Sequence, residues 1–185
     1  DLLEEGSLRT KLHADLGQMQ HLVEQGLAYA RSAQAMQEPE MPTDLPTLLE
    51  SMVADYQDAS QAVRWLGGSG FETVFTRPGA LRRAVGNLVD NAVKFGGGAE
   101  VALTQREGRC CIVVQDRGPG IPEHERDKVL LPFYRMEPSR NAGTGGTGLG
   151  LAIVQRLVRH CHAQLILDAR VGGGLCACIL FDLPG

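Results

Sequence analysis

The segment from Thr144 to Leu151, with the sequence TGGTGLGL, restricts the fold of this chain more than any other. Four of its eight residues are glycine, which weakens helix and strand interiors, so the segment should be a loop. An apolar helix to about His160 follows it. A glycine-rich backbone can approach a ligand closely, and a helix start adds unpaired N–H donors and the positive end of a dipole. The segment therefore predicts a phosphate-binding loop, although glycine-rich turns also serve as hinges.

Two better-known phosphate motifs do not fit this segment. No Gly-Lys-Ser/Thr follows, as a P-loop requires, and no strand directly precedes it, as the dinucleotide fingerprint requires. The pattern elsewhere predicts an α+β protein, because helices are grouped with strands of antiparallel type in a two-layer α/β sandwich. The expected helices are 44–58, 78–94 and 148–160, and the expected strands are 62–66, 71–76, 100–105, 109–115, 164–169 and 175–183.

The N-terminal part predicts one long helix over residues 7–33. Its apolar residues recur at spacings of three and four and form one narrow stripe, which is typical of a helix in a bundle or a dimer. A surface helix of the same domain is the alternative. Residues 36–46 hold three prolines among polar residues and predict a linker. The stripe comprises Leu8, Leu12, Leu16, Met19, Val23, Leu27 and Ala30.

Composition excludes several classes of protein. The net charge is −4 and aromatic residues make up 5%, so a nucleic-acid surface is not expected. No apolar run approaches the ~20 residues of a membrane helix. The chain begins at Asp1 without a signal peptide, and we expect it to be part of a longer protein. The five cysteines form no regular framework, so we expect reduced thiols in a reducing compartment, packed as small apolar residues.

The helix expected over residues 78–94 carries an unusual pair of asparagines. Asn87 and Asn91 are four residues apart and share one helix face, although asparagine is a poor helix former. Their amide oxygens are hard ligands suited to Mg²⁺, and Lys94 could neutralise a phosphate. A plain exposed polar face is an equally good interpretation of this segment by itself.

Two further segments have ligand-binding character. Asp116 follows a strand and precedes Gly118 and Gly120, so its carboxylate could accept from an adenine amino group while the base lies against bare backbone; a solvated turn is the simpler alternative. The segment Leu131-Pro-Phe-Tyr-Arg135 lies in a long loop over residues 124–146. Loops of this length are uncommon unless functional, so the segment could form a lid that packs when nucleotide is bound; a hydrophobic anchor that pins the loop is the alternative.

These four segments, in this order, resemble the N, G1, F and G2 boxes of the sensor histidine kinases of two-component systems, and within that family the EnvZ-type osmosensors. The resemblance implies the Bergerat nucleotide-binding fold. It also implies that residues 1–35 are the second helix of the dimerisation hairpin, 36–46 a linker and 47–185 the catalytic domain.

The resemblance assigns roles to particular residues. It implies ATP and Mg²⁺ as ligands, with the metal at Asn91 and Asn87, a phosphate contact at Lys94 and adenine recognition by Asp116. Gly118 and Gly120 would shape the base pocket, Phe133 and Tyr134 would belong to the lid, and Arg135 or Arg140 could reach the terminal phosphates. The phosphate cradle would comprise Gly146, Thr147, Gly148, Leu149 and Gly150.

One position narrows the expected chemistry. Hydrolytic ATPases of this fold carry a glutamate general base four residues before the metal-binding asparagine, whereas this chain has Asn87 there. An amide cannot take a proton at neutral pH. The site should therefore hold ATP until a nucleophile arrives, which favours a kinase over a hydrolase.

The acceptor histidine is not expected within this chain. The segment Gly6-Ser-Leu-Arg-Thr-Lys-Leu12 resembles the family's acceptor box, but Gly6 stands where the histidine belongs. We therefore expect no catalytic residue here, a homodimer and a cognate response regulator as partners of the whole protein, no nucleic acid, and a cytoplasmic position below a bacterial inner membrane that only upstream segments would reach. A degenerate kinase acting as a scaffold and a hydrolytic ATPase remain alternatives.

Overall fold

The computed structural model describes residues 37–68, 73–136 and 148–182, together with six helical positions between residues 16 and 27. Its centre is a five-stranded sheet in the order β2-β4-β5-β7-β6. Only β2 and β4 run parallel; the other neighbours are antiparallel. These strands are β2 (Val63–Gly68), β4 (Ala99–Arg106), β5 (Arg109–Gln115), β6 (Ala163–Ala169) and β7 (Leu175–Phe181).

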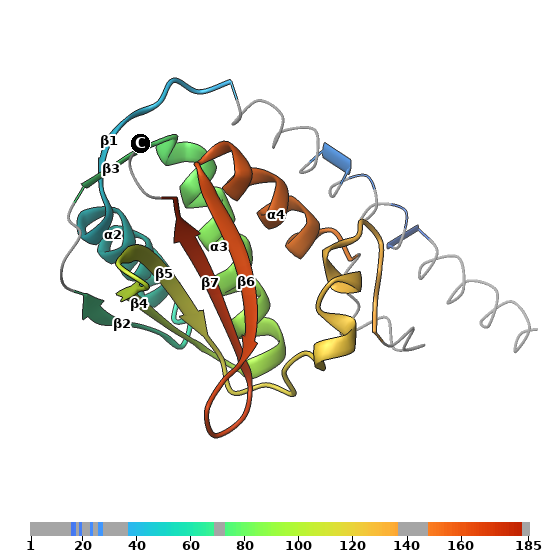
Figure 1. Ribbon diagram of the computed structural model, residues 1–185. Coiled ribbons are helices and arrows are strands. Elements are labelled where there is room, and N and C mark those ends of the chain that lie inside the picture. Colours follow the sequence, from blue (N-terminus) through green and yellow to red (C-terminus); the bar gives the residue numbers. More distant parts are fainter. Residues whose placement is uncertain are drawn as a thin grey trace, which may run out of the picture.

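Three helices cover one face of this sheet, as Figure 1 shows. They are α2 (Leu45–Asp58), α3 (Pro78–Gly96) and α4 (Gly150–His160), with α3 packed against α4. Each helix buries one stripe of small and branched apolar residues against the sheet, and its opposite side faces solvent. The predicted two-layer sandwich is present, and its core lies between the layers. Fully buried members include Leu49, Leu81, Ile112, Leu157 and Ile179.

Helix boundaries follow local chemistry. The Asp44 side chain accepts from the Thr47 backbone N–H at 2.7 Å and caps α2, and Pro46 sits in the first turn, where no intrahelical donor is needed. Pro78 begins α3 in the same way. Gly97 ends α3 in a left-handed conformation with φ of 72°, a conformation that favours glycine.

The predicted linker over residues 36–46 is partly structured. Strand β1 (Met41–Asp44) pairs antiparallel with β3 (Thr73–Thr76) as a small second sheet, and α2 begins at Leu45. Residues 41–44 of the segment expected to be a linker are therefore a strand of a sheet. Pro42 is compatible with this strand because the sheet has only two strands, so each strand has a free edge.

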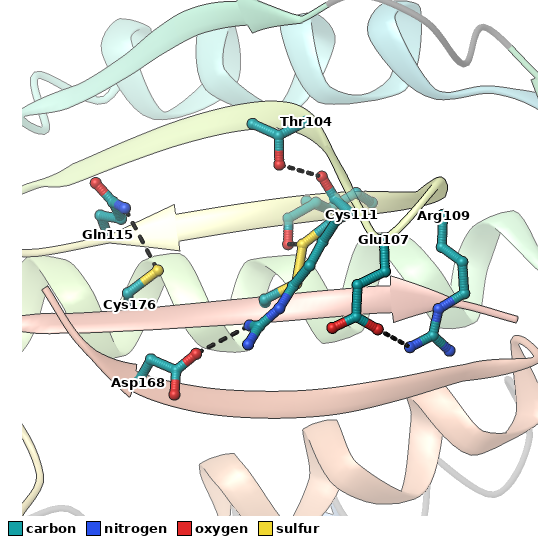
Figure 2. The surroundings of a disulfide bond; sticks show 10 residues. Thr104, Glu107, Arg109, Cys111, Gln115, Asp168 and Cys176 are labelled. Atoms are coloured by element: carbon teal, nitrogen blue, oxygen red, sulfur yellow. Dashed lines mark hydrogen bonds and ion pairs between the residues drawn. A yellow bond between two sulfur atoms is a disulfide. The ribbon is translucent and has the colours of Figure 1, made fainter.

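The cysteines divide between the two faces of the sheet. Cys110 and Cys161 are buried in the main core as expected, and burial raises the pKa of the Cys110 thiol to about 11. Cys111 and Cys178 lie on the opposite face and are joined by a disulfide, so the expectation that all five are thiols is wrong. Figure 2 shows these surroundings, with Cys176 near Gln115.

Strand register explains the bridge between Cys111 and Cys178. On the neighbouring strands β5 and β7, Val113 pairs with Cys178, so Cys111 lies diagonally beside it on the same face. The two Cα atoms are 6.1 Å apart, within the range of a disulfide. Sequence spacing alone does not give this register.

The apolar stripe predicted for the N-terminal helix can be described at four positions. Leu16, Met19, Val23 and Leu27 are helical, and their side chains are 50–64% exposed. The other stripe positions lie outside the described residues. No helix in the described part of the chain is long and apolar enough to cross a membrane.

Candidate nucleotide-binding site

Helix α3 carries the asparagine pair at the edge of its buried stripe. Asn87 donates from Nδ2 to the Arg83 carbonyl at 2.8 Å. This bond fixes the amide orientation and leaves the Asn87 oxygen, the atom that a cation needs, outside that hydrogen bond. Both asparagines are half-buried, so their side chains can reach a ligand. The donor set fits Mg²⁺, which takes oxygen ligands and keeps several of its waters.

The start of α4 lies against Asn91. A Cβ atom on Gly150 would be 3.3 Å from Asn91 Nδ2 and 3.4 Å from Asn91 Oδ1. The cap residue of α4, Leu149, provides no side-chain hydrogen bond to the first turn. Leu149 thus leaves the first backbone N–H groups of α4, beside the Asn91 amide, without a side-chain cap from the described residues, as an anion-binding helix start requires.

The segment Leu131–Met136 meets the glycine-rich loop backbone to backbone. Phe133 N–H donates to the Gly148 carbonyl at 3.0 Å. A Cβ on Gly148, whose φ is 73°, would lie 2.5 Å from the Tyr134 carbonyl oxygen, so only glycine fits there. The predicted lid segment and the predicted phosphate cradle are thus adjacent, while the Phe133 side chain stays 66% exposed.

A small polar cluster holds this segment on its other side. The Tyr134 hydroxyl donates to the Glu125 carboxylate, which also accepts from Lys128 at 2.8 Å. The hydrogen bonds from Lys128 and Tyr134 lower the pKa of Glu125, and the bond to Glu125 raises the pKa of Tyr134. The long loop predicted over residues 124–146 is partly ordered here by two short 3₁₀ turns, Glu123–Glu125 and Lys128–Leu130.

Asp116 is held rigidly at the end of β5. Its side chain is buried, and its Oδ1 accepts from the Gly118 N–H at 2.7 Å and the Leu175 N–H at 3.2 Å. Its own backbone N–H donates to the Leu175 carbonyl at 3.0 Å. The other carboxylate oxygen, Oδ2, takes part in neither bond, and an adenine amino group needs one such acceptor.

The loop after Asp116 packs against the end of α3. A Cβ on Gly118 would be 2.7 Å from the Phe95 carbonyl oxygen, and one on Gly96 would be 2.6 Å from the Asp116 Cβ. Asp116 and Gly118, two of the three residues expected to shape the base pocket, therefore adjoin the same helix that carries the asparagines, whereas a Cβ on Gly120 would be 2.9 Å from the Gly174 carbonyl oxygen.

Three residues that support Asp116 were not expected from the sequence. Arg170 donates from Nη1 to the Asp116 carbonyl at 3.1 Å. The Leu175 N–H donates to Asp116 Oδ1, and the Leu175 carbonyl accepts from the Asp116 N–H. Gly174, with φ of 109°, lets the β6–β7 turn approach so closely that a Cβ would be 2.1 Å from the Asp116 carbonyl oxygen. The triple glycine at 172–174 signals a turn, but nothing in the sequence indicates what that turn touches.

The structure thus places the expected residues in two neighbouring groups along α3. The first group consists of Asn91 with Gly150, and of Gly148 with Phe133 and Tyr134. The second group consists of Asp116 and Gly118, which lie at the C-terminal end of α3. Lys94 and Arg135 are exposed, and the Lys94 ammonium is 5.5 Å from the centre of the Phe95 ring. Arg140, Gly146 and Thr147 lie outside the described residues. The role of each residue toward a ligand stays a prediction.

Comparison with known proteins gives a consistent result. The model of the family described as histidine kinase-, DNA gyrase B- and HSP90-like ATPase matches residues 76–185. The sensor protein RstB of Escherichia coli K12 is 33% identical over 169 residues, which are 88% of this chain and 39% of RstB. The histidine-protein kinase BaeS of the same organism is 31% identical over 98% of this chain and 38% of BaeS. The chain spans about two fifths of these relatives.

Solved structures show the same fold. The NMR structure of the histidine kinase domain of the E. coli osmosensor EnvZ is 32% identical, with a TM-score of 0.60 over 80% of this chain and 92% of that domain. The crystal structure of full-length ShkA in complex with AMPPNP is 27% identical, with a TM-score of 0.67 over 89% of this chain and 36% of ShkA. The predicted Bergerat-type sandwich is confirmed.

Proposed function

Because this chain belongs to the family of histidine kinase-, DNA gyrase B- and HSP90-like ATPases and is similar along most of its length to sensor histidine kinases, we propose that it binds ATP with Mg²⁺ and transfers the γ-phosphate to a histidine. The observation that carries this proposal is the contact of the Asn91 amide with the uncapped start of α4. That contact puts a cation ligand beside an anion site, which is the pairing that a metal-bound polyphosphate needs.

The chemistry assigned to this chain is positioning and charge neutralisation, which dominate phosphoryl transfer. The Asn91 and Asn87 oxygens would hold the metal ion, and the N–H groups at the start of α4, with Gly148 and Leu149, would hold the phosphates. Asp116 Oδ2 would accept from the adenine amino group. Lys94, Arg135 and Arg140 would neutralise charge on the phosphates, and Phe133 and Tyr134 would cover them.

Asn87 separates this proposal from hydrolysis. Asn87, whose amide donates to the Arg83 carbonyl, stands at the position to which the resemblance assigns the general base of hydrolytic ATPases of this fold. Without a base to activate water, bound ATP should survive until a more nucleophilic imidazole arrives. A hydrolytic ATPase of the same fold is the alternative that this residue argues against.

The whole protein's partners follow from the same proposal. The phosphohistidine would pass its phosphoryl group to a cognate response regulator, and residues 1–35 would belong to a dimerisation hairpin ahead of a catalytic domain at 47–185. The exposed stripe of Leu16, Met19, Val23 and Leu27 supports a packing partner for that helix. We place this domain on the cytoplasmic side of a membrane-bound sensor.

The test is a single substitution at the missing base. Asn87→Glu should raise steady-state ATP hydrolysis above the parent rate, because a general base typically contributes about 10²–10⁴-fold. Asn87→Gln is the matched control, since it has similar length without a carboxylate, and it should leave hydrolysis slow. Rapid hydrolysis by the parent itself, at the rate of Asn87→Glu, would show that the chain is a hydrolase.

A further inference from the structure

A pocket lies at Asp116, and its lining includes none of the residues assigned to phosphate and metal. Its volume is about 180 Å³, several times the ~30 Å³ of one water in the liquid. It is lined by the Gly96–Glu100 segment after α3, by Arg64 of β2, by Gln115–Arg117 at the end of β5 and by Arg170. Asp116 is the only residue that this lining shares with the candidate nucleotide-binding residues.

Three arginines surround one carboxylate in this pocket. Arg64 donates to Glu100 Oε1 and Arg170 to Glu100 Oε2, while Arg117 Nη2 is 3.9 Å from Oε1. Burial acts to raise the pKa of Glu100, but the hydrogen bond from Arg64 and the charge of Arg170 outweigh it and lower this pKa. Glu100 is therefore ionised at neutral pH. The three guanidinium groups exceed it by two charges, and by one if the Asp116 carboxylate is also counted.

The three arginines comprise one buried residue, Arg170, and two exposed ones, Arg64 and Arg117. The Arg170 side chain is 12% exposed, and both of its terminal nitrogens are used, toward the Asp116 carbonyl and Glu100. The Arg64 and Arg117 side chains are 66% and 73% exposed. The 3.9 Å approach of Arg117 is too long for a hydrogen bond, so its donors remain available for a ligand.

A purely structural ion pair would need only Arg170 and Glu100. Exposed partners such as Arg64 and Arg117 contribute little to stability, so a structural role does not explain why both converge on the same cavity. Two guanidinium forks that converge from different elements can each bind two oxygens of a tetrahedral anion, whereas a single carboxylate satisfies one fork.

We infer that the pocket formed by Arg64, Arg117, Arg170 and Glu100 binds a phosphate group, either as inorganic phosphate or on a small phosphate monoester. Arg64 and Arg117 are the residues that bind the phosphate, and the ion pair of Arg170 with Glu100 supports the pocket structurally. Arg170 also donates to the backbone carbonyl of Asp116. The pocket is therefore linked through Arg170 to the residue whose carboxylate is assigned to adenine. The inference does not depend on the proposed nucleotide site.

The test is a titration of the folded chain with inorganic phosphate at constant ionic strength, followed by ¹H–¹⁵N NMR. We expect saturable shifts at the amides of Gly96 to Ala99 and of Arg117. Arg117→Gln should weaken phosphate binding about tenfold or more, since it removes charge-assisted hydrogen bonds. Glycerol phosphate, used as a second probe, distinguishes a monoester site by tighter binding than inorganic phosphate.

Two control variants make the titration decisive. Arg82→Gln removes another exposed arginine, which pairs with Asp55 of α2 at 3.4 Å and does not line the pocket, and it should bind phosphate as the parent does. Asn91→Ala should also keep the shifts at Arg117. Loss of binding in Asn91→Ala with retention in Arg117→Gln would place the phosphate at the nucleotide site and overturn the inference, as would equal weakening in Arg82→Gln.

Discussion

At the residue scale, Asp116 illustrates how the fold prepares a side chain for one contact. Its Oδ1 is taken by two backbone N–H groups, from Gly118 and Leu175, so the carboxylate cannot rotate freely. Only the second oxygen is left for a base. In the proposed role as acceptor for an adenine amino group, a carboxylate fixed before the ligand arrives would lose little entropy on binding, which would favour affinity and selectivity for adenine over guanine.

Asp116→Asn tests this assignment with little change in shape. Asparagine keeps an oxygen for Gly118 and Leu175, so the free energy of unfolding should change by about 1 kcal/mol or less. Its NH₂ group cannot accept from the adenine amino group, so ATP affinity should fall about 10- to 100-fold, as expected for a charged hydrogen bond of ~1.5–3 kcal/mol. Calorimetric titration with ATP and GTP measures the nucleotide affinities. Unchanged ATP affinity would remove Asp116 from the base pocket.

The sequence indicates candidate ligand-binding residues more readily than it indicates the residues that support them. Asn87, Asn91 and Asp116 stand out because polar side chains interrupt apolar patterns or follow a strand. Gly174 and Leu175 do not, because they support Asp116 from about 58 residues along the chain, through the register of β5 with β7. Register is set by tertiary pairing and is not encoded locally.

At the element scale, the helices and main strands were predicted to within a few residues, because their apolar periodicities and proline or glycine boundaries are local signals. Strand β1 was missed because four residues that include Pro42 carry no alternation of their own and become a strand only by pairing with β3. The disulfide between Cys111 and Cys178 was missed for the same reason, since it depends on which strands adjoin.

The junction of the lid segment with α4 supports a prediction at this scale. Gly148→Ala would force a side chain into a left-handed conformation, at about 1–2 kcal/mol, and against the Tyr134 carbonyl at 2.5 Å. We expect a larger loss of unfolding free energy than that strain alone, together with weaker nucleotide binding, because the Leu131–Met136 segment must move.

Gly172→Ala is the matched control for this junction. Gly172 also has a positive φ, of 87°, but a Cβ there would meet nothing within 4 Å. Urea unfolding should therefore show only the strain of about 1–2 kcal/mol, and nucleotide affinity should be unchanged. Equal effects of the two substitutions on nucleotide affinity would mean that the contact with Tyr134 does not position the site.

At the scale of the whole molecule, α2 is part of the same core as the candidate site, although it precedes the residues that match the family model. Leu45 and Leu49 are fully buried among residues of α3 and the sheet. A fragment that starts at α3 would expose this surface to water, so the folded unit has to include α2.

Leu49→Ala measures the contribution of α2 to that unit. The lost burial and the cavity should lower the free energy of unfolding by about 2–5 kcal/mol. Leu66→Ala removes the same atoms at a position that is 56% exposed and should change stability by about 0.5 kcal/mol or less. Chemical denaturation of both variants checks the difference, and similar values would show that α2 is not integral to the core.

The most direct test of the central claim is calorimetric titration of the chain with a non-hydrolysable ATP analogue, with and without Mg²⁺, beside Asn91→Ala and Arg82→Ala. Arg82 precedes Asn91 by nine residues, about 2.5 turns at ~3.6 residues per turn, so it lies on the opposite face of α3. We predict Mg²⁺-dependent binding by the parent and Arg82→Ala, and loss of binding in Asn91→Ala. No binding by the folded parent would contradict the account and favour a degenerate kinase that acts as a scaffold and no longer binds nucleotide.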